Sequence, residues 1–214
     1  MKNPLWKRLP RELKSYFGKY IVIFLFMTLT IGFVSGFLVA DDSMLAAYDE
    51  GFEKYNIEHG NFTLSSKASE SDLKKIEKNG KVRICENFYR DEATDADLDG
   101  NEEETMRIYQ ERTDMNLVCL MSGGMPAAKN EIAIDRMYAD NNKLKVGDKL
   151  KIAGEELTVT GFVALPDYSC LFSDNSDMMF DAVKFGVGIM TEEGADAFGT
   201  THLEYRYSWQ YETA

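Results

Sequence analysis

Three aspartates alternate along residues 95–99 and precede a glycine, a pattern suited to binding a cation. The run Asp95-Ala96-Asp97-Leu98-Asp99-Gly100 matches the start of a calcium-binding EF-hand loop, in which alternating carboxylates supply oxygen ligands. That loop also needs an apolar eighth residue and a bidentate Glu at its twelfth position. These positions hold Glu102 and Met106. The sequence therefore predicts a solvated acidic loop over 95–104, with weak cation binding as the alternative.

Other residues with catalytic chemistry lack the neighbours that a reaction needs. His59 and His202 have no Ser or Cys nucleophile motif nearby, and Ser122 lies outside the GxSxG pattern of a nucleophile elbow. Phosphate-loop, HExxH and dinucleotide-binding motifs are absent from the sequence. We therefore expect no enzyme, and no catalytic, cofactor-binding or metal residue. Four further acids show no pairing pattern: Asp167, Asp174, Asp177 and Asp181.

The element that decides where the protein is placed in the cell is an apolar run over residues 20–40. Its 21 residues carry no charge and form a helix about 31 Å long, close to the roughly 30 Å hydrocarbon core of a bilayer. We predict a transmembrane helix. A cleaved signal peptide is the alternative, because Leu38-Val39-Ala40 resembles a cleavage site, but signal peptides have shorter apolar regions of about 7 to 15 residues.

Charges beside this run predict its orientation. Residues 1–19 contain six basic residues and one acid, whereas Asp41 and Asp42 follow the run. Basic flanks stay in the cytoplasm. We expect a cell-membrane protein with a cytoplasmic N-terminus and residues 41–214 outside. Residues 1–19 form an amphipathic basic lead-in with apolar spacing at Leu5, Leu9 and Leu13.

Four small residues recur every four positions in the predicted span and so share one face of the helix. They are Thr28, Gly32, Gly36 and Ala40. Small residues allow a second helix to approach closely, because van der Waals packing drives helix association in lipid. We predict that this face packs on a helix of another molecule or of a further part of the protein.

The remainder of the chain is acidic. Six of the 24 basic and one of the 36 acidic residues precede residue 41, which leaves 18 basic and 35 acidic residues for 41–214. Such a surface repels phosphate backbones, so nucleic acid is not expected as a partner. The three cysteines, Cys85, Cys119 and Cys170, are too few for a disulfide framework and are interpreted as small buried residues.

Hydrophobic patterns after the span predict an α+β domain with a mixed β-α-β order and a small β-rich subdomain. Ser69 and Asp135 are expected to cap helices, and Gly154 to form the tight turn of a hairpin. Residues 90–104 are interpreted as a polar acidic insert and 166–180 as a loop. Expected helices cover 43–55, 70–79 and 136–142, and expected strands cover 61–64, 82–89, 116–121, 131–134, 149–152, 157–163 and 187–190.

The order of these features resembles a known family. The motifs that carry the likeness are Glu131-Ile132-Ala133-Ile134, Ala139, Leu144-Lys145-Val146-Gly147-Asp148 and Val159-Thr160-Gly161-Phe162-Val163. After a basic lead-in and one span, they resemble the FtsX-like, MacB-type permease subunits of ABC transporters over about residues 5–195. Residues 167–185 resemble Gram-positive members more than the efflux-pump branch. The set is moderately specific, whereas no single motif is.

The resemblance implies a function in which this chain itself catalyses no reaction. In the family, a cytoplasmic ATPase drives motion that the first span carries to the outer domain, called mechanotransmission. The implied partners are a cytoplasmic ABC ATPase subunit, further permease helices or a second permease copy, and the lipid bilayer. Family members carry further spans, so residues 41–214 would be a MacB-like core domain that is incomplete at its C-terminus. The alternative is a single-pass, membrane-anchored extracellular binding or sensor domain.

Overall fold

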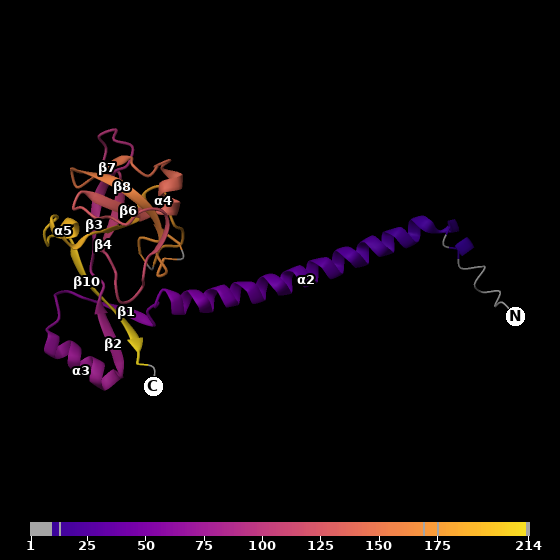
Figure 1. Ribbon diagram of the computed structural model, residues 1–214, viewed down its shortest axis with the longest axis horizontal. Coiled ribbons are helices and arrows are strands. Elements are labelled where there is room, and N and C mark those ends of the chain that lie inside the picture. Colours follow the sequence, from indigo (N-terminus) through magenta and orange to yellow (C-terminus); the bar gives the residue numbers. More distant parts are fainter. Residues whose placement is uncertain (1–9, 13, 169, 175, 213–214) are drawn as a thin grey trace. The chain divides into compact units, whose positions relative to one another are not determined.

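The computed structural model describes residues 10–12, 14–168, 170–174 and 176–212, and the chain divides into two compact units, Met1–Glu50 and Gly51–Ala214 (Figure 1). The first unit contains most of one long helix, and the second contains all the strands. Leu5, Leu9 and Leu13 of the expected amphipathic lead-in lie outside the described residues.

Helix α2, Phe17–Lys54, is 38 residues long, or about 57 Å at 1.5 Å per residue. Among the described residues it is the one helix long and apolar enough to cross a membrane, with a mean hydropathy of 2.4 over its most apolar stretch. Every side chain from residue 17 to residue 50 is exposed. An apolar helix without a protein cover suits a lipid environment. The expected helical continuation over 43–55 is confirmed up to Lys54.

A small three-stranded layer lies in the second unit. Strand β10 (Leu203–Tyr211) pairs antiparallel with both β1 (Gly60–Leu64) and β2 (Val82–Glu86), so β1 and β2 flank it and run parallel to each other. Helix α3 (Glu70–Gly80) connects β1 to β2. This is a split β-α-β unit, and it confirms the expected β-α-β order.

Local chemistry sets the limits of α3. The Ser69 hydroxyl accepts a hydrogen bond from the backbone N–H of Asp72 at 3.3 Å, which satisfies one free donor at the helix start. The helix ends at Gly80, and the residue after it, Lys81, is the C-cap with a left-handed φ of 51°. The predicted cap at Ser69 is therefore confirmed.

Six strands close into a barrel. Each strand pairs with the next in the order β3, β4, β9, β6, β8 and β7, and β7 pairs with β3 through Thr94–Ile152 and Asp95–Lys151. Strand β5 also pairs antiparallel with β8, at residues 161–164, beyond the part of β8 that pairs with β7. The barrel strands and β5 are β3 (Tyr89–Asp95), β4 (Glu104–Gln110), β5 (Cys119–Gly123), β6 (Glu131–Asp135), β7 (Lys149–Ile152), β8 (Glu155–Ala164) and β9 (Phe185–Met190).

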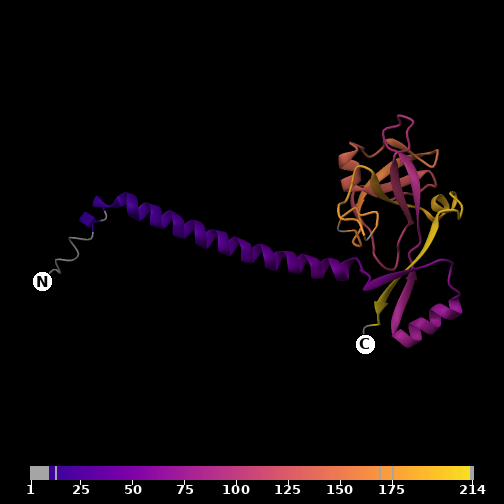
Figure 2. The same ribbon diagram turned by 180° about the vertical axis from the view of Figure 1, so that it is seen from behind.

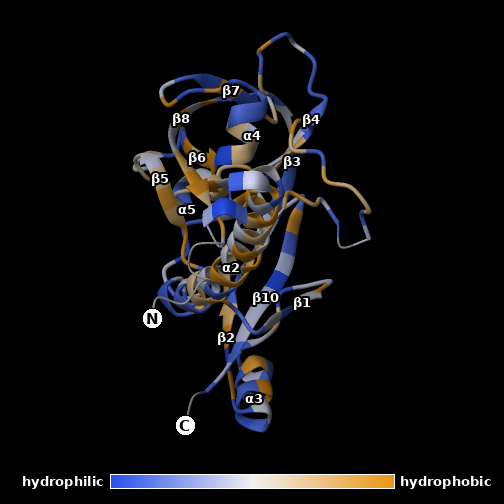
Figure 3. Ribbon diagram, turned by 90° about the vertical axis from the view of Figure 1, so that its right-hand side faces the viewer, coloured by the Kyte–Doolittle hydropathy of each residue, from blue (hydrophilic) through white to orange (hydrophobic). Residues whose placement is uncertain are grey.

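The barrel encloses the hydrophobic core. Ile132 and Ile134 of β6 and Val187 and Ile189 of β9 are fully buried, and the orange colour over β6 in Figure 3 marks this apolar centre. Two short helices, α4 (Arg136–Asn141) and α5 (Glu192–Asp196), pack against the strands. The Asp135 carboxylate caps α4 through the N–H groups of Met137 and Tyr138, as the sequence predicts.

Several expected elements need correction. The polar insert 90–104 contains most of β3 and the start of β4, and the expected strand 82–89 is divided between β2 and β3. The expected strand 116–121 begins later, as β5 at Cys119. Strands β4 and β10 and helix α5 were not expected. The helix 136–142, the β7–β8 hairpin with Gly154 at its turn, and the strands 131–134 and 187–190 are confirmed.

Candidate functional site

The predicted small-residue face lies on α2. Thr28, Gly32, Gly36 and Ala40 are exposed and spaced at intervals of four, so they lie on one side of the helix. A methyl group added at Gly32 or Gly36 would meet no atom within 4 Å. The Thr28 hydroxyl donates to the Phe24 carbonyl at 2.8 Å, so its hydrogen-bond donor is satisfied within the helix. The face is therefore smooth and open to a second helix, and its use for packing stays a prediction.

The aspartate motif forms a tight turn between β3 and β4. Both Asp95 carboxylate oxygens accept backbone N–H groups, from Asp99 at 3.1 Å and from Gly100 at 2.9 Å. The carboxylates of Asp95, Asp97 and Asp99 lie together, with one oxygen of each within 4.8 Å of the others. Met106, at the twelfth position, is fully buried in the core. An EF-hand is therefore excluded, since its twelfth residue must reach the ion.

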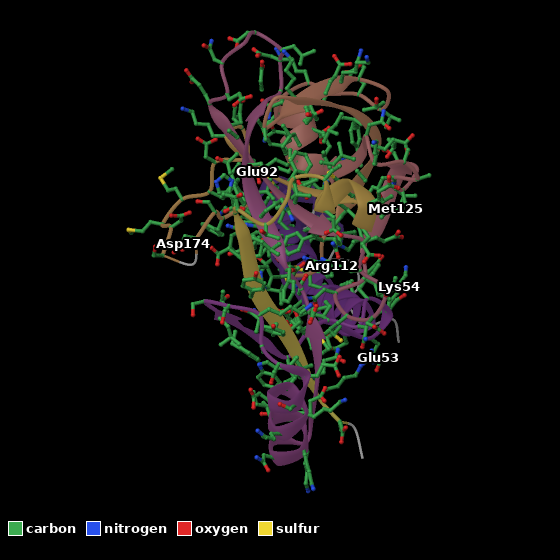
Figure 4. All side chains as sticks on the ribbon, turned by 90° about the vertical axis from the view of Figure 1, so that its left-hand side faces the viewer. Glu53, Lys54, Glu92, Arg112, Met125 and Asp174 are labelled. Atoms are coloured by element: carbon green, nitrogen blue, oxygen red, sulfur yellow. The ribbon has the colours of Figure 1, made fainter. Side chains whose placement is uncertain are left out.

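A cluster of buried arginines lies between the barrel and the β1–β10–β2 layer. Arg112 is paired with Asp167 at 2.7 Å, and the side chains are only 6% and 3% exposed. Arg206 on β10 contacts Glu58 at 3.1 Å, also in a buried setting. Figure 4 shows Arg112 in the interior of the domain. Because a buried charge needs a partner, these pairs tie the two halves of the domain together.

Aromatic rings complete the cluster. The Arg112 guanidinium carbon lies 4.1 Å from the ring centre of Tyr109, and the Tyr109 hydroxyl is 2.8 Å from that of Tyr168. Burial alone would lower the pKa of Arg112, but the interactions with Asp167, Tyr109 and Tyr168 together outweigh this effect and the net direction is upward. Burial likewise raises the pKa of the Tyr109 hydroxyl. The arginines thus stay charged and the tyrosine stays protonated at neutral pH.

An open cavity of about 370 Å³ borders this cluster. Arg107 and Arg206 line it together with Asn61 and Thr63 of β1 and the loop that carries Tyr168. Arg107 binds Asp91 through two hydrogen bonds of 2.7 Å. Each arginine therefore has a carboxylate partner, and the charges are balanced. The arrangement holds strands together and offers no activated nucleophile.

The remaining residues singled out in the sequence are spread over the fold. Asp167 has a partner, contrary to the expectation of an unpaired acid, because Arg112 binds it. Asp174 lies on a loop at the side of the domain (Figure 4), where its N–H donates to Asp177. His59 lies among the rings of Phe52, Trp209 and Tyr211. His202 is 3.0 Å from Glu92, and Ser122 is on β5. Asp181 accepts the N–H groups of Val183 and Lys184.

The cysteines are free thiols in half-buried positions. Burial raises the pKa of the Cys85 thiol, which lowers its reactivity. The Tyr55 hydroxyl donates to Cys119 Sγ at 3.0 Å. These observations agree with small packed residues rather than reactive groups.

The arginine cluster was missed in the sequence. The sequence did contain a signal. Arg107 and Arg206 lie in the runs Arg107-Ile108-Tyr109 and Tyr205-Arg206-Tyr207, and in each run the other two residues favour β-strands. An arginine inside such a run is a candidate for a buried, paired charge. Its partners could not be read, because Glu58 and Asp167 lie far from these strands in the sequence.

Comparisons with known proteins give a weak likeness among solved structures. No protein-family model matches the chain, and no curated protein matches its sequence. Among solved structures, it is similar to the extracellular domain of the noncanonic ABC-type transporter YknZ from Gram-positive bacteria, with 13% identity over 74% of this chain and 84% of that chain. The TM-score of 0.42 is too low to transfer a fold or a residue role from that domain.

Proposed function

We propose that this chain is the N-terminal part of an ABC transporter permease, which couples a cytoplasmic ATPase to an extracytoplasmic domain by conformational change. In this proposal the chain is not itself an enzyme. The apolar run 20–40 spans the cell membrane, the basic lead-in is cytoplasmic, and residues 41–214 are outside. The order of sequence motifs from Glu131 to Val163 supports the family.

The observation that carries the proposal is the unbroken helix. Helix α2 continues for 14 residues beyond Ala40 to Lys54. Its last turn belongs to the second unit, and within that unit the next residue is hydrogen-bonded: the Tyr55 carbonyl accepts the N–H of Leu117 at 2.8 Å. A helix without a flexible linker can transmit a displacement along its axis, whereas a loop would absorb it. A passive anchor does not need this continuity.

The partners follow from the exposed surface of α2. A cytoplasmic ABC ATPase would supply the motion. Further permease helices, or a second copy of the permease, would cover the face of Thr28, Gly32, Gly36 and Ala40. Both are proposals that rest on the family resemblance and on the open helix face.

Purification from the native membrane tests the association. We expect the tagged chain, extracted in mild detergent, to retain a subunit that hydrolyses ATP. Recovery of the chain without an ATPase, from membranes where the protein is folded, would favour the alternative of an anchored binding or sensor domain.

A helix-breaking variant tests the coupling itself. Replacing Asp41, Asp42 and Ser43 by glycine weakens the helix by about 1 kcal/mol per residue relative to alanine. We expect ATP and vanadate to change hydrogen exchange in β1 of the complex in the triple-alanine control and not in the triple-glycine variant. Equal changes in both variants would show that helix continuity does not matter.

A further inference from the structure

The turn between β3 and β4 differs from an ordinary solvated acidic loop in what it buries. Asp95 is only 1% exposed. One oxygen of Glu104, Oε2, is buried and has no hydrogen-bond partner. None of the ion pairs among the described residues involves Asp95, Asp97, Asp99 or Glu104. A buried carboxylate oxygen without any partner is costly, so the Glu104 oxygen calls for a hydrogen-bond donor or a cation nearby.

Strand pairing explains how Glu104 reaches the aspartates. Glu104 pairs directly with Thr94, the residue before Asp95. The turn therefore returns Glu104 to the place where the aspartate motif begins. An EF-hand loop would have its last carboxylate at residue 106, whereas this hairpin brings the carboxylate of residue 104 back toward the turn.

The separation of the oxygens fits a single ion. Two oxygens bound to the same calcium ion at about 2.4 Å can lie at most about 4.8 Å apart. One carboxylate oxygen from each of Asp95, Asp97 and Asp99 meets that limit. The loop is hydrophilic for most of its length and projects at the top of the barrel in Figure 1, beyond β7, so an ion can reach it (Figures 1 and 3).

A buried hydroxyl gives independent evidence of a missing ligand. Tyr138 of α4 is fully buried, and its hydroxyl has no hydrogen-bond partner. Its ring lies against Gly186, next to the Met106 side chain. Since side chains two apart on a strand share a face, Glu104 points to the same side of β4 as Met106. Helix α4 follows the end of β6, which lies beside the start of β9, and β9 runs parallel to β4, so Tyr138 lies at the end of the barrel where Glu104 begins β4.

Electrostatics agree with this placement. Burial and then the charges of Glu104, Asp95 and Asp97 raise the pKa of the Tyr138 hydroxyl. The Tyr138 hydroxyl therefore lies within the field of these carboxylates.

We propose that Asp95, Asp97 and Asp99 form a calcium site, in which a water bound to the ion links it to the Glu104 carboxylate and the Tyr138 hydroxyl. Calcium accepts a flexible shell of carboxylate and water oxygens, whereas magnesium requires a compact octahedron. The site is independent of the proposed transport function. Its affinity falls in the range of extracellular calcium modules, with a dissociation constant of about 10⁻⁴ to 10⁻³ M.

Calorimetry on the full chain in detergent tests the site. After removal of cations by a chelator, we expect a saturable heat of binding for calcium chloride up to about 5 mM. The variant Asp97→Asn with Asp99→Asn should bind at least about tenfold more weakly. Both residues are exposed, and the asparagine side-chain oxygens can still accept the backbone N–H groups of Asp99 and Asn101. No saturable heat, or equal affinity for magnesium chloride, would overturn the assignment.

A second acidic turn provides a matched control. Asp174 and Asp177 are exposed and accept similar turn hydrogen bonds. The variant Asp174→Asn with Asp177→Asn removes the same charge and should leave calcium binding unchanged. An equal loss in this control would show charge screening instead of a built site.

The variant Glu104→Gln separates a site from a fold defect. Without calcium, it should be at least as heat-stable as the parent, because it removes a buried charge from an acidic cluster. Calcium at about 5 mM should raise the Tm of the parent by about 2 to 5 °C and that of the variant much less. An equal rise in both would exclude a role for Glu104 in the site.

Discussion

Arg112 and Asp167 are the residues whose roles are best defined by burial, since both side chains are almost fully removed from solvent. We predict that Asp167→Ala lowers the free energy of unfolding by about 3 to 5 kcal/mol, because it leaves the Arg112 charge unpaired inside the protein. Urea unfolding followed by tryptophan fluorescence measures the loss. The exposed pair Glu70–Lys74 is the control, and Glu70→Ala should leave the urea midpoint nearly unchanged.

The same pair has a second test at the residue scale. Replacing both partners by apolar residues, Arg112→Met with Asp167→Leu, should recover most of the stability lost in Asp167→Ala. The double change removes the charge together with its partner. If the double variant is as unstable as the single one, packing around Tyr109 rather than the unpaired charge accounts for the loss.

At the scale of elements, the sequence predicted the helices and strands that are marked by alternating hydrophobic residues or by capping residues. The helix capped by Asp135 and the β7–β8 hairpin follow from local signals and are present. Strand β3 was missed because its buried positions hold Arg90, Glu92 and Thr94, polar residues that a hydrophobic pattern assigns to the surface. The backbone and His202 satisfy them, since Arg90 donates to the Gly199 carbonyl at 2.6 Å and Glu92 lies 3.0 Å from His202.

Two further features of the fold could not be predicted from the sequence because they depend on contacts between distant residues. Strand β10 alternates from Leu203 to Tyr211 and was within reach of the sequence, but its place between β1 and β2 depends on pairing over more than a hundred residues. Barrel closure rests on two residue pairs between β3 and β7, which no local pattern indicates. For the candidate calcium site, the aspartates were visible in the sequence, whereas the return of Glu104 and the approach of Tyr138 required the fold.

Helix α2 carries the prediction at the element scale. Replacing Gly32 and Gly36 by leucine adds bulk to the small-residue face, which should prevent close helix packing and lower the recovery of a partner span or second copy at least about tenfold. Thr30→Leu with Val34→Leu adds bulk on the opposite side of the helix and should preserve recovery. Cross-linking in native membranes, followed by gel analysis, measures both. Equal recovery would assign the association to another surface.

For the whole molecule, the charge asymmetry across the apolar run is the feature that sets orientation. Six basic residues precede it, and Asp41 and Asp42 follow it. From the positive-inside rule we expect residues 41–214 to lie outside the cytoplasm. The acidic surface of the second unit is compatible with either side of the membrane, so this expectation depends on the flanking charges.

Cysteine labelling in intact cells tests the orientation. In a variant with Cys85, Cys119 and Cys170 replaced by alanine, a new cysteine at Met178, which is 97% exposed, should react with a membrane-impermeant maleimide. A cysteine at Lys14, before the span, should react only after the membrane is permeabilised. The opposite pattern would place the barrel in the cytoplasm and remove the basis for an extracytoplasmic domain driven by an ATPase. Reaction of both sites in intact cells would indicate that the helix does not span the bilayer.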